Sequence, residues 1–237
     1  MVVRIAGLAY QKGFGGHFHN DNSLAVFRDI PGIVLACPSN GADAVNMLFA
    51  CIAEARAQRR VIVFIEPIAR YLTRDLYAAD DGLWSFRYEV PGDDELIAVG
   101  EPGVSGTGKD LAVISYGNGY YLSLKAARVL REEHGIEART IDLRWLVPID
   151  SRALLQAVAG CRHILIVDEC RRSGSVSEGL MTLFLEQGNG ERCARITAED
   201  SFIPLAEAAN LVLPDAGRIV QGALDLVHRR PGDPRIN

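Results

Sequence analysis

Short unbroken apolar runs alternate along the chain with segments whose apolar residues recur every three or four positions. The first pattern is typical of strands buried in a parallel sheet, and the second of amphipathic helices. The predicted strands are residues 1–5, 33–37, 61–65, 111–115, 138–143, 163–168 and 192–197. The predicted helices are residues 23–28, a segment that begins at Pro38-Ser39, and residues 120–133, 151–158, 176–186 and 216–228. This order predicts an α/β fold with right-handed crossovers and mainly parallel sheets covered on both faces.

The periodic pattern weakens between Ile68 and about Lys109, where Asp-Asp-Gly and Pro-Gly steps interrupt the chain. Such steps favour turns and connections, although residues 96–100 are apolar enough for one further strand. We therefore expect two three-layer units, residues 1–90 and 109–237, joined by a linker over residues 91–108. The first unit has too few strands for a complete sheet, so it should expose an apolar edge that favours association.

Composition narrows the range of functions. Apolar residues make up 49% and charged residues 23% of the 237 residues, and the formal charge is −5. A net negative charge argues against nucleic acid or an anionic membrane as the main partner, and no apolar run approaches the length that spans a bilayer. The five cysteines are odd in number and widely spaced, which is typical of reduced thiols in a cytoplasmic protein.

Unusual chemistry is concentrated in Gly13-Phe-Gly-Gly-His-Phe-His-Asn-Asp-Asn22, directly after the first predicted strand. Ligands of open α/β sheets bind at the carboxyl ends of strands, where this loop would bring His17 and His19. A connection whose histidines are merely solvated explains the pattern equally well. We do not expect a metal site, because Asp21 alone would leave the ligand shell of two histidines incomplete.

Three other sites carry polar groups at strand ends. Glu66 ends the strand at 61–65 and is either a functional carboxylate or one half of a salt bridge. Gly117-Asn-Gly119 could cradle an anion, but plain turn chemistry is the favoured interpretation. Residues 168–174, Asp-Glu-Cys-Arg-Arg-Ser-Gly, are interpreted as a salt-bridged loop between domains or subunits.

Several motifs resemble one family. His17-Phe-His19, Ile30-Pro-Gly-Ile33, Cys37-Pro-Ser39 and Phe64-Ile-Glu-Pro67 are similar to the later part of the pyrimidine-binding domain of thiamine-diphosphate enzymes. Residues 108–117, 141–150 and 167–174 are similar to the transketolase C-terminal domain. Together they resemble the beta subunit of the decarboxylating component of 2-oxo acid dehydrogenase complexes, of the pyruvate and branched-chain type. The resemblance covers nearly the whole chain and is most specific in Ile141–Asp150.

The resemblance implies an activity and a site. His19 matches the family's active-site histidine, which assists oxidative decarboxylation of a 2-oxo acid and transfer of the acyl group to a lipoyl arm. His17, Phe18, Asn20 and Asp21 would form the neighbourhood of substrate and cofactor. Asn20-Asp21 stands where the family usually has Ser-Gln, so the usual substrate specificity is not implied.

The resemblance also implies thiamine diphosphate shared with a partner chain and Mg²⁺ held by that partner. The family's Gly-Asp-Gly motif belongs to an alpha subunit or domain and does not occur here. Its aminopyrimidine-binding glutamate and aromatic residue would precede Met1. The chain is then a fragment, a split-gene product or a subunit that borrows the rest. We expect it to need upstream pyrimidine-domain residues and an alpha subunit or domain, with a second beta-like chain and a lipoyl acyltransferase core as further partners. The segment after Cys51 departs from the family's spacing, so no monovalent cation is expected.

Two further functions stay open. One is a non-catalytic dimerisation or docking module that keeps the C-terminal domain intact. The other is a relative of transketolase or deoxyxylulose-phosphate synthase, whose closing domain is built alike. The His17-Phe-His19 loop favours the dehydrogenase component over the second of these.

Overall fold

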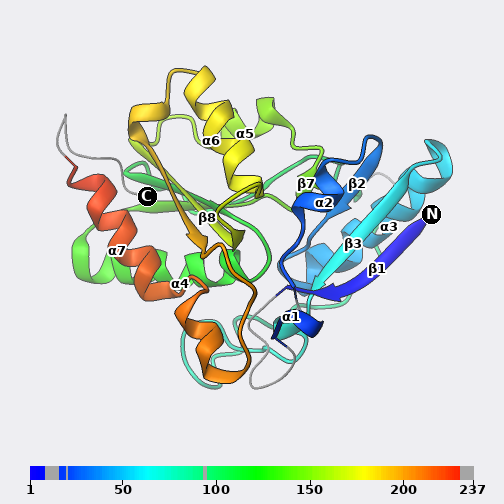
Figure 1. Ribbon diagram of the computed structural model, residues 1–237, viewed down its shortest axis with the longest axis horizontal. Coiled ribbons are helices and arrows are strands. Elements are labelled where there is room, and N and C mark those ends of the chain that lie inside the picture. The colour runs from blue at the N-terminus through cyan, green and yellow to red at the C-terminus, as the bar shows by residue number, and fades with distance from the viewer. Residues whose placement is uncertain (9–15, 20, 93–94, 230–237) are drawn as a thin grey trace.

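The structure is a computed structural model that describes residues 1–8, 16–19, 21–92 and 95–229. Within these residues the strands form two sheets, the first on the right and the second on the left of Figure 1. The first sheet has the order β1-β3-β2-β7, with β1 at Val2–Gly7, β3 at Val61–Pro67, β2 at Ile33–Ala36 and β7 at Trp145–Val147. The first three strands are parallel, and β7 runs antiparallel to β2.

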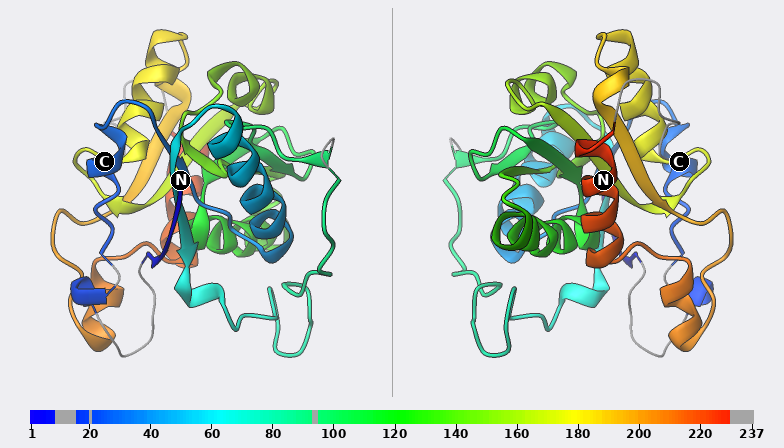
Figure 2. Two further views of the ribbon diagram at one scale, coloured as in Figure 1. Left: turned by 90° about the vertical axis from the view of Figure 1, so that its right-hand side faces the viewer. Right: turned by 90° about the vertical axis from the view of Figure 1, so that its left-hand side faces the viewer.

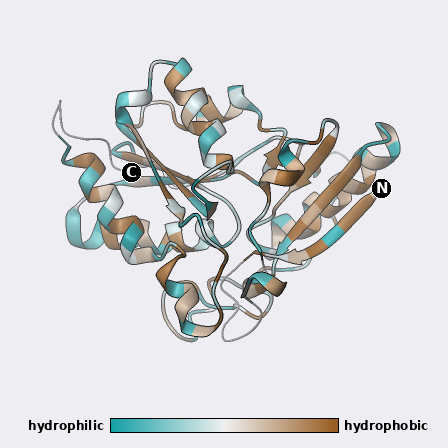
Figure 3. Ribbon diagram, in the orientation of Figure 1, coloured by the Kyte–Doolittle hydropathy of each residue, from teal (hydrophilic) through white to brown (hydrophobic). Residues whose placement is uncertain are grey.

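The second sheet has the order β4-β6-β5-β8-β9. Its strands are β4 (Gly103–Ser105), β6 (Ala138–Asp142), β5 (Leu111–Ser115), β8 (His163–Arg171) and β9 (Cys193–Ala198). Every pairing is parallel except that of β4 with β6. The strands of both sheets are mostly hydrophobic along their length (Figure 3), as expected of sheets covered on both faces. The predicted α/β class with mainly parallel sheets is therefore confirmed.

Helices cover both faces of the second sheet. On one face lie α4 (Gly117–His134) and α7 (Ala216–Val227), and on the other α5 (Ser151–Ala157) and α6 (Val176–Glu186). In the first unit α3 (Gly41–Ala57) covers one face, and α1 (Gly16–His19) and α2 (Ala25–Arg28) are single turns. Short 3₁₀ turns are η1 (Ile68–Arg70), η3 (Gly190–Arg192) and η4 (Ala206–Leu211).

The second face of the first sheet is buried against the other unit. Leu35, Val63 and Ile65 belong to the same buried cluster as Ile141 and Leu143 of the second unit. The two units thus share one hydrophobic core, which also receives the inner residues of α5 and α6. Since a core of this size resists separation, the units are held in one arrangement.

The short strand β7 also links the two units through strand pairing. It comes from the second half of the sequence, yet it pairs with β2, and its Trp145 is fully buried against Met47 and Phe64 of the first unit. The expected boundaries at 1–90, 91–108 and 109–237 stay a prediction. Whatever the boundaries are, the first sheet includes a strand from beyond residue 109.

Two local details differ from the sequence-based expectation, which places the helix cap at Ser39 and one further strand at residues 96–100. Asn40, not Ser39, caps α3, because its Oδ1 accepts the Asp43 N–H at 2.9 Å. No strand forms at residues 96–100; the segment from η1 to β4 instead runs as an irregular connection around the outside of the molecule (Figure 2). Asp150 and Asp215 cap α5 and α7, because their carboxylates accept hydrogen bonds from backbone N–H groups at 2.9 and 2.8 Å.

The cysteines and the helices agree with the compositional analysis. All five cysteines are free thiols with buried side chains. In the part of the chain that the structure describes, no helix has both the length and the apolar character needed to cross a membrane.

Candidate functional site

The single turn α1 carries His17 and Phe18 and lies beside the segment before η4, at the lower edge of Figure 1. The His17 N–H donates to the Ile203 carbonyl at 3.1 Å, and the imidazole lies 4.8 Å from the Phe202 ring, between centroids. Phe18 also lies against the imidazole and is 74% exposed. The histidine loop is therefore attached to the C-terminal unit, with apolar rings at its surface.

The end of the same loop is tied to β8. Asp21 accepts a hydrogen bond from Ser23 and forms an ion pair with Arg171 at 2.6 Å. Partial burial acts to raise the pKa of Asp21, but these two partners outweigh it and the pKa lies below its usual value. The Asn22 amide donates to the Glu169 carbonyl. Asp21 and Asn22 thus anchor the end of the loop to residues that lie about 150 positions later in the chain.

A charged triad stands at the carboxyl end of β3. The Glu66 carboxylate accepts from Arg4 Nε at 2.5 Å and from the Tyr71 hydroxyl at 2.6 Å. Burial acts to raise the pKa of Glu66, but its two partners outweigh burial, and the pKa lies below its usual value. For Tyr71, burial and the neighbouring carboxylate raise the pKa to about 12. Of the two interpretations of Glu66, the structure shows the salt bridge.

The segment at residues 168–174 is not an exposed loop. Strand β8 continues to Arg171, and the Asp168 and Glu169 side chains are fully buried. Asp168 accepts from the Tyr116 hydroxyl at 2.6 Å and from the Cys170 and Ser177 N–H groups at 2.9 and 2.8 Å. The interpretation of this segment as a salt-bridged loop between domains holds for Arg171, which pairs with Asp21 of the first unit. It is wrong for Asp168 and Glu169, because a nine-residue strand carries both into the interior.

Glu169 occupies the N-terminus of α4. Its carboxyl oxygens accept from the Asn118 N–H at 3.0 Å and from the Asn118 amide at 2.9 Å. A Cβ at Gly117, where φ is +54°, would lie 2.9 Å from Glu169 Oε1 and 2.8 Å from Leu8 Cδ1. The position expected to cradle an anion is therefore filled by the chain's own carboxyl group, that of Glu169. Burial raises the pKa of Glu169 to about 8, against the effect of the Asn118 donors.

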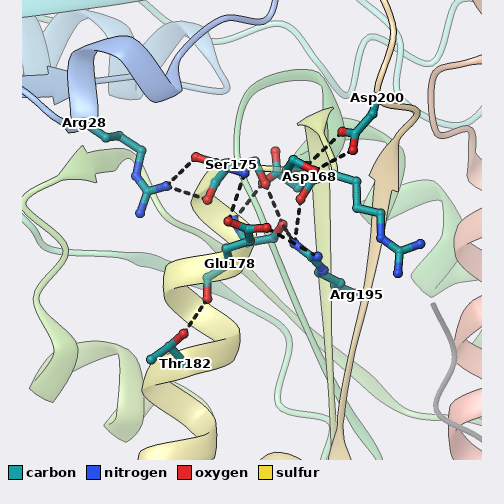
Figure 4. Close-up of polar contacts among 11 residues, drawn as sticks. Arg28, Asp168, Ser175, Glu178, Thr182, Arg195 and Asp200 are labelled. Atoms are coloured by element: carbon teal, nitrogen blue, oxygen red, sulfur yellow. Dashed lines mark hydrogen bonds and ion pairs between the residues drawn. The ribbon is translucent and has the colours of Figure 1, made fainter.

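Polar contacts around the start of α6 extend this arrangement (Figure 4). From α2, Arg28 donates to the carbonyls of Gly174 and Ser175, the former at 3.0 Å. Arg195 lies 3.8 Å from Glu178 and donates to Ser177 Oγ at 3.2 Å. Arg28 therefore joins the first unit to α6 next to the buried Asp168.

A second buried carboxyl group lies where β6 ends. Burial raises the pKa of Asp142 to about 7, and the neighbouring Asp43 acts in the same direction. Arg144 binds Asp43 through two 2.9 Å hydrogen bonds, with both side chains less than one-fifth exposed. The contact between the units thus contains two carboxyl groups, Asp142 and Glu169, whose environment favours the protonated form near neutral pH.

The chain's own residues do not fit the metal-diphosphate group of thiamine-diphosphate enzymes. Among the described residues there is no cluster of His, Cys, Asp and Glu that could hold a metal ion. At the carboxyl edge of the first sheet, the Glu66 carboxylate is already engaged by Arg4 and Tyr71, so it is not available as the partner of an aminopyrimidine.

The fold and these contacts agree with comparisons to known proteins. Residues 100–219, just over half of the chain, match the model of the transketolase C-terminal domain. The chain therefore belongs to the transketolase C-terminal domain family.

Curated relatives extend the likeness to both units. Over 233 residues the chain is 28% identical to the pyruvate dehydrogenase E1 component subunit beta of Staphylococcus aureus strain Mu50, which covers 93% of this chain and 65% of that protein. The corresponding subunit of Staphylococcus epidermidis strain RP62A is 30% identical over 226 residues, covering 92% and 64%. The chain spans about 65% of the length of these relatives. The expected resemblance to a 2-oxo acid dehydrogenase beta subunit is confirmed.

Solved structures show the same fold at low identity. A split gene transketolase, described as an inactive beta4 tetramer, aligns with a TM-score of 0.67 at 19% identity, over 95% of this chain and 66% of its own. Transketolase from Campylobacter jejuni aligns with a TM-score of 0.59 at 14% identity, over 94% and 31%.

The predicted site residues fall into two groups. The structure brings His17, Phe18 and Asp21 together along the anchored loop. Asn20 and the side chain of His19 lie outside the described residues, and their roles stay a prediction. The sequence pointed to Asn118 only as part of a possible anion cradle and did not reveal Tyr116; a strand pattern that continued past Asp168 was the available signal for their buried partners.

Proposed function

We propose that this chain is the beta-like part of the decarboxylating component of a 2-oxo acid dehydrogenase. The observation that carries the proposal is the similarity to pyruvate dehydrogenase E1 beta subunits over more than nine-tenths of the chain, including both units. In this role the chain contributes to the oxidative decarboxylation of a 2-oxo acid and to transfer of the acyl group to a lipoyl arm. It works in the cytoplasm, since its five cysteines are free thiols.

Other chains complete the site. Because the described residues hold no metal-binding cluster, we assign thiamine diphosphate to a site shared with an alpha subunit or domain, which also holds Mg²⁺. A second beta-like chain and a lipoyl acyltransferase core are the further partners. The substrate is a 2-oxo acid whose identity is left open by Asn20 and Asp21.

His19 is the residue of this chain that we assign to catalysis. It stands in α1, two residues after His17, whose backbone is bonded to the C-terminal unit. An imidazole can donate and accept protons near neutral pH, and positioned acid-base groups commonly contribute about 10²- to 10⁴-fold to a rate. The anchored loop would fix its distance to the substrate.

The test is turnover of a 2-oxo acid by the complex reconstituted with an alpha-type partner. We expect His19→Ala to lower turnover by about 10²- to 10⁴-fold and His17→Ala to lower it less. His134→Ala, at the exposed end of α4, is the matched control, and thermal midpoints of all variants are measured in parallel. Wild-type turnover in His19→Ala, or a loss that follows lost stability, would contradict the assignment.

One observation favours a second candidate, a non-catalytic dimerisation or docking module. The split gene transketolase with the same fold is described as an inactive beta4 tetramer. If this chain binds an alpha-type partner or itself, but the reconstituted complex shows no turnover above that of the partner alone, the module is the better description.

A further inference from the structure

A cavity of about 580 Å³ lies between the N-terminus of α3, the end of β3 and the segment at residues 70–88. This is within the usual size range of small-molecule sites. Its floor is apolar and includes Ala44, Leu48 and Phe64, and Trp84 and Phe86 stand on the side of the irregular segment. The residues that line it do not include His17, Phe18 or Asp21, so it is separate from the histidine loop.

Unused hydrogen-bond donors lie at one end of the cavity. The Ser39 side chain lines it and is only 2% exposed. The Asp142 carboxyl lies beside it, and the hydroxyl acts against burial to lower the pKa of that carboxyl, but neither Ser39 Oγ nor Asp142 Oδ2 makes a hydrogen bond of acceptable geometry in the described residues. A buried hydroxyl without a partner costs free energy, which a bound acceptor would recover.

The first turn of α3 adds backbone donors at the same end. Asn40 caps the helix by accepting the Asp43 N–H, whereas the N–H groups of Gly41 and Ala42 have no acceptor in the described part of the chain. Helix α3 has 17 residues, so its N-terminus carries the positive end of a full helix dipole. Such an N-terminus favours an anion.

The charged side chains that line the cavity are mostly positive, which suits an anion. Arg4, Arg70, Arg74 and Arg87 line it, against the single carboxylate of Glu66 among the described lining residues. Arg4 is paired with Glu66, and Arg70 donates to Asn118 at 3.1 Å. The guanidinium of Arg74 makes no hydrogen bond or ion pair within the residues that the structure describes, and it is exposed at the rim. The balance of these charges is positive.

We propose that this cavity binds a small organic anion. Its carboxylate or phosphate group lies at the start of α3, where it accepts hydrogen bonds from Ser39 and the first-turn N–H groups and faces Arg74. Its apolar body packs between Phe64 and Leu48 on one side and Phe86 on the other, since a Cβ added at Gly41 would lie 3.7 Å from the Phe86 ring. The site is distinct from the proposed catalytic one and does not depend on it.

Calorimetric titration of the full chain with phenyl phosphate and with phenylacetate tests the proposal and distinguishes the two anionic groups. We expect a dissociation constant of about 0.1–1 mM for at least one of them, and weaker binding of inorganic phosphate and of the neutral benzyl alcohol. Ser39→Ala should weaken binding about fivefold and Arg74→Gln about tenfold. Ala44→Leu, which fills the floor, should weaken the aromatic anions more than inorganic phosphate. Arg152→Gln, an exposed arginine on α5, is the control and should bind as wild type does.

Specific outcomes would overturn the proposal. One is absence of heat up to about 10 mM of both aromatic anions. Another is that Arg74→Gln and Arg152→Gln weaken binding of the aromatic anions equally, which would indicate a general effect of net charge. A third is an affinity for the aromatic anions that falls as the chain self-associates, measured over a range of chain concentrations. A second copy of the chain would then be the occupant of the cavity. Thermal midpoints within a few degrees of wild type establish that each variant is folded; Arg74→Gln, at an exposed position, keeps the test valid if Ser39→Ala is unstable.

Discussion

Replacing Glu169 with glutamine isolates the titration of one buried carboxyl group. The side chain is fully buried at the N-terminus of α4, and burial raises its pKa to about 8 despite the two donors of Asn118. Its charged or titratable neighbours include Asp168 and Arg70, and also Cys37, Tyr116 and Cys170. Glutamine keeps the shape of the side chain but cannot ionise.

The sign and size of the effect follow from the two pKa values. In the unfolded chain this carboxyl group titrates near 4.5, so between about pH 4.5 and 8 the folded protein binds a proton that the unfolded chain has released. The stabilisation that comes from this bound proton is complete below pH 4.5 and is lost as the pH rises to 8. With 1.36 kcal/mol for each pKa unit, the loss between pH 6 and pH 8 is about 2 kcal/mol for Glu169 alone. Asp142, with a pKa of about 7, adds a loss of the same sign.

Urea denaturation at pH 6, 7 and 8 measures this quantity. We expect the wild-type free energy of unfolding to fall by about 2 kcal/mol more than that of Glu169→Gln over this range. Glu186→Gln, an exposed carboxylate on α6, is the control and should keep the wild-type pH dependence. If wild type and Glu169→Gln lose stability in parallel, Glu169 is ionised throughout and the reasoning from burial fails.

Three further predictions concern the contact between the units, the cofactor and association. Arg144→Gln should lower the free energy of unfolding by about 3 kcal/mol, measured by urea denaturation, because it leaves Asp43 beside Asp142 without its cation; an effect below about 0.5 kcal/mol would show that the pair is solvated. The chain alone should bind thiamine diphosphate and Mg²⁺ only weakly by calorimetry, since no metal-binding cluster is found among its described residues; micromolar affinity, about −8 kcal/mol, would refute this. Sedimentation should show a dimer or larger species, because β1 is an edge strand of the first sheet in the described structure, and a stable monomer would count against it.

Much of the fold could be predicted because the hydrophobic pattern of this chain is locally consistent. Helix α6 has the predicted limits, and β5 matches residue for residue, since each is bounded by clear turn or capping signals. The irregular segment after η1 was found as a loss of periodicity. Its apolar residues 96–99 were mistaken for a strand because they pack beside α3 as a loop.

The candidate site was harder to predict, for a physical reason. Asp168 and Glu169 are acidic residues, which the sequence pattern alone places at the surface. Their burial depends on hydrogen-bond donors that lie elsewhere in the chain, on Tyr116, Asn118 and Ser177. Ser39 and Arg74 likewise meet at one cavity only after folding. The local hydrophobic pattern identifies strands and helices. Whether a polar side chain can be buried depends on hydrogen-bond partners that lie far away in the sequence.

The origin of β7 has a consequence for biosynthesis. As the chain leaves the ribosome, β1, β2 and β3 emerge well before Trp145–Val147, the strand that covers the free side of β2. At translation rates of about 5–20 residues per second, several seconds pass in which β2 is an open edge and the pocket for Trp145 is exposed. A nascent chain stalled within this interval should therefore be a substrate for ribosome-associated chaperones, whereas one released after residue 147 has passed the exit tunnel should not.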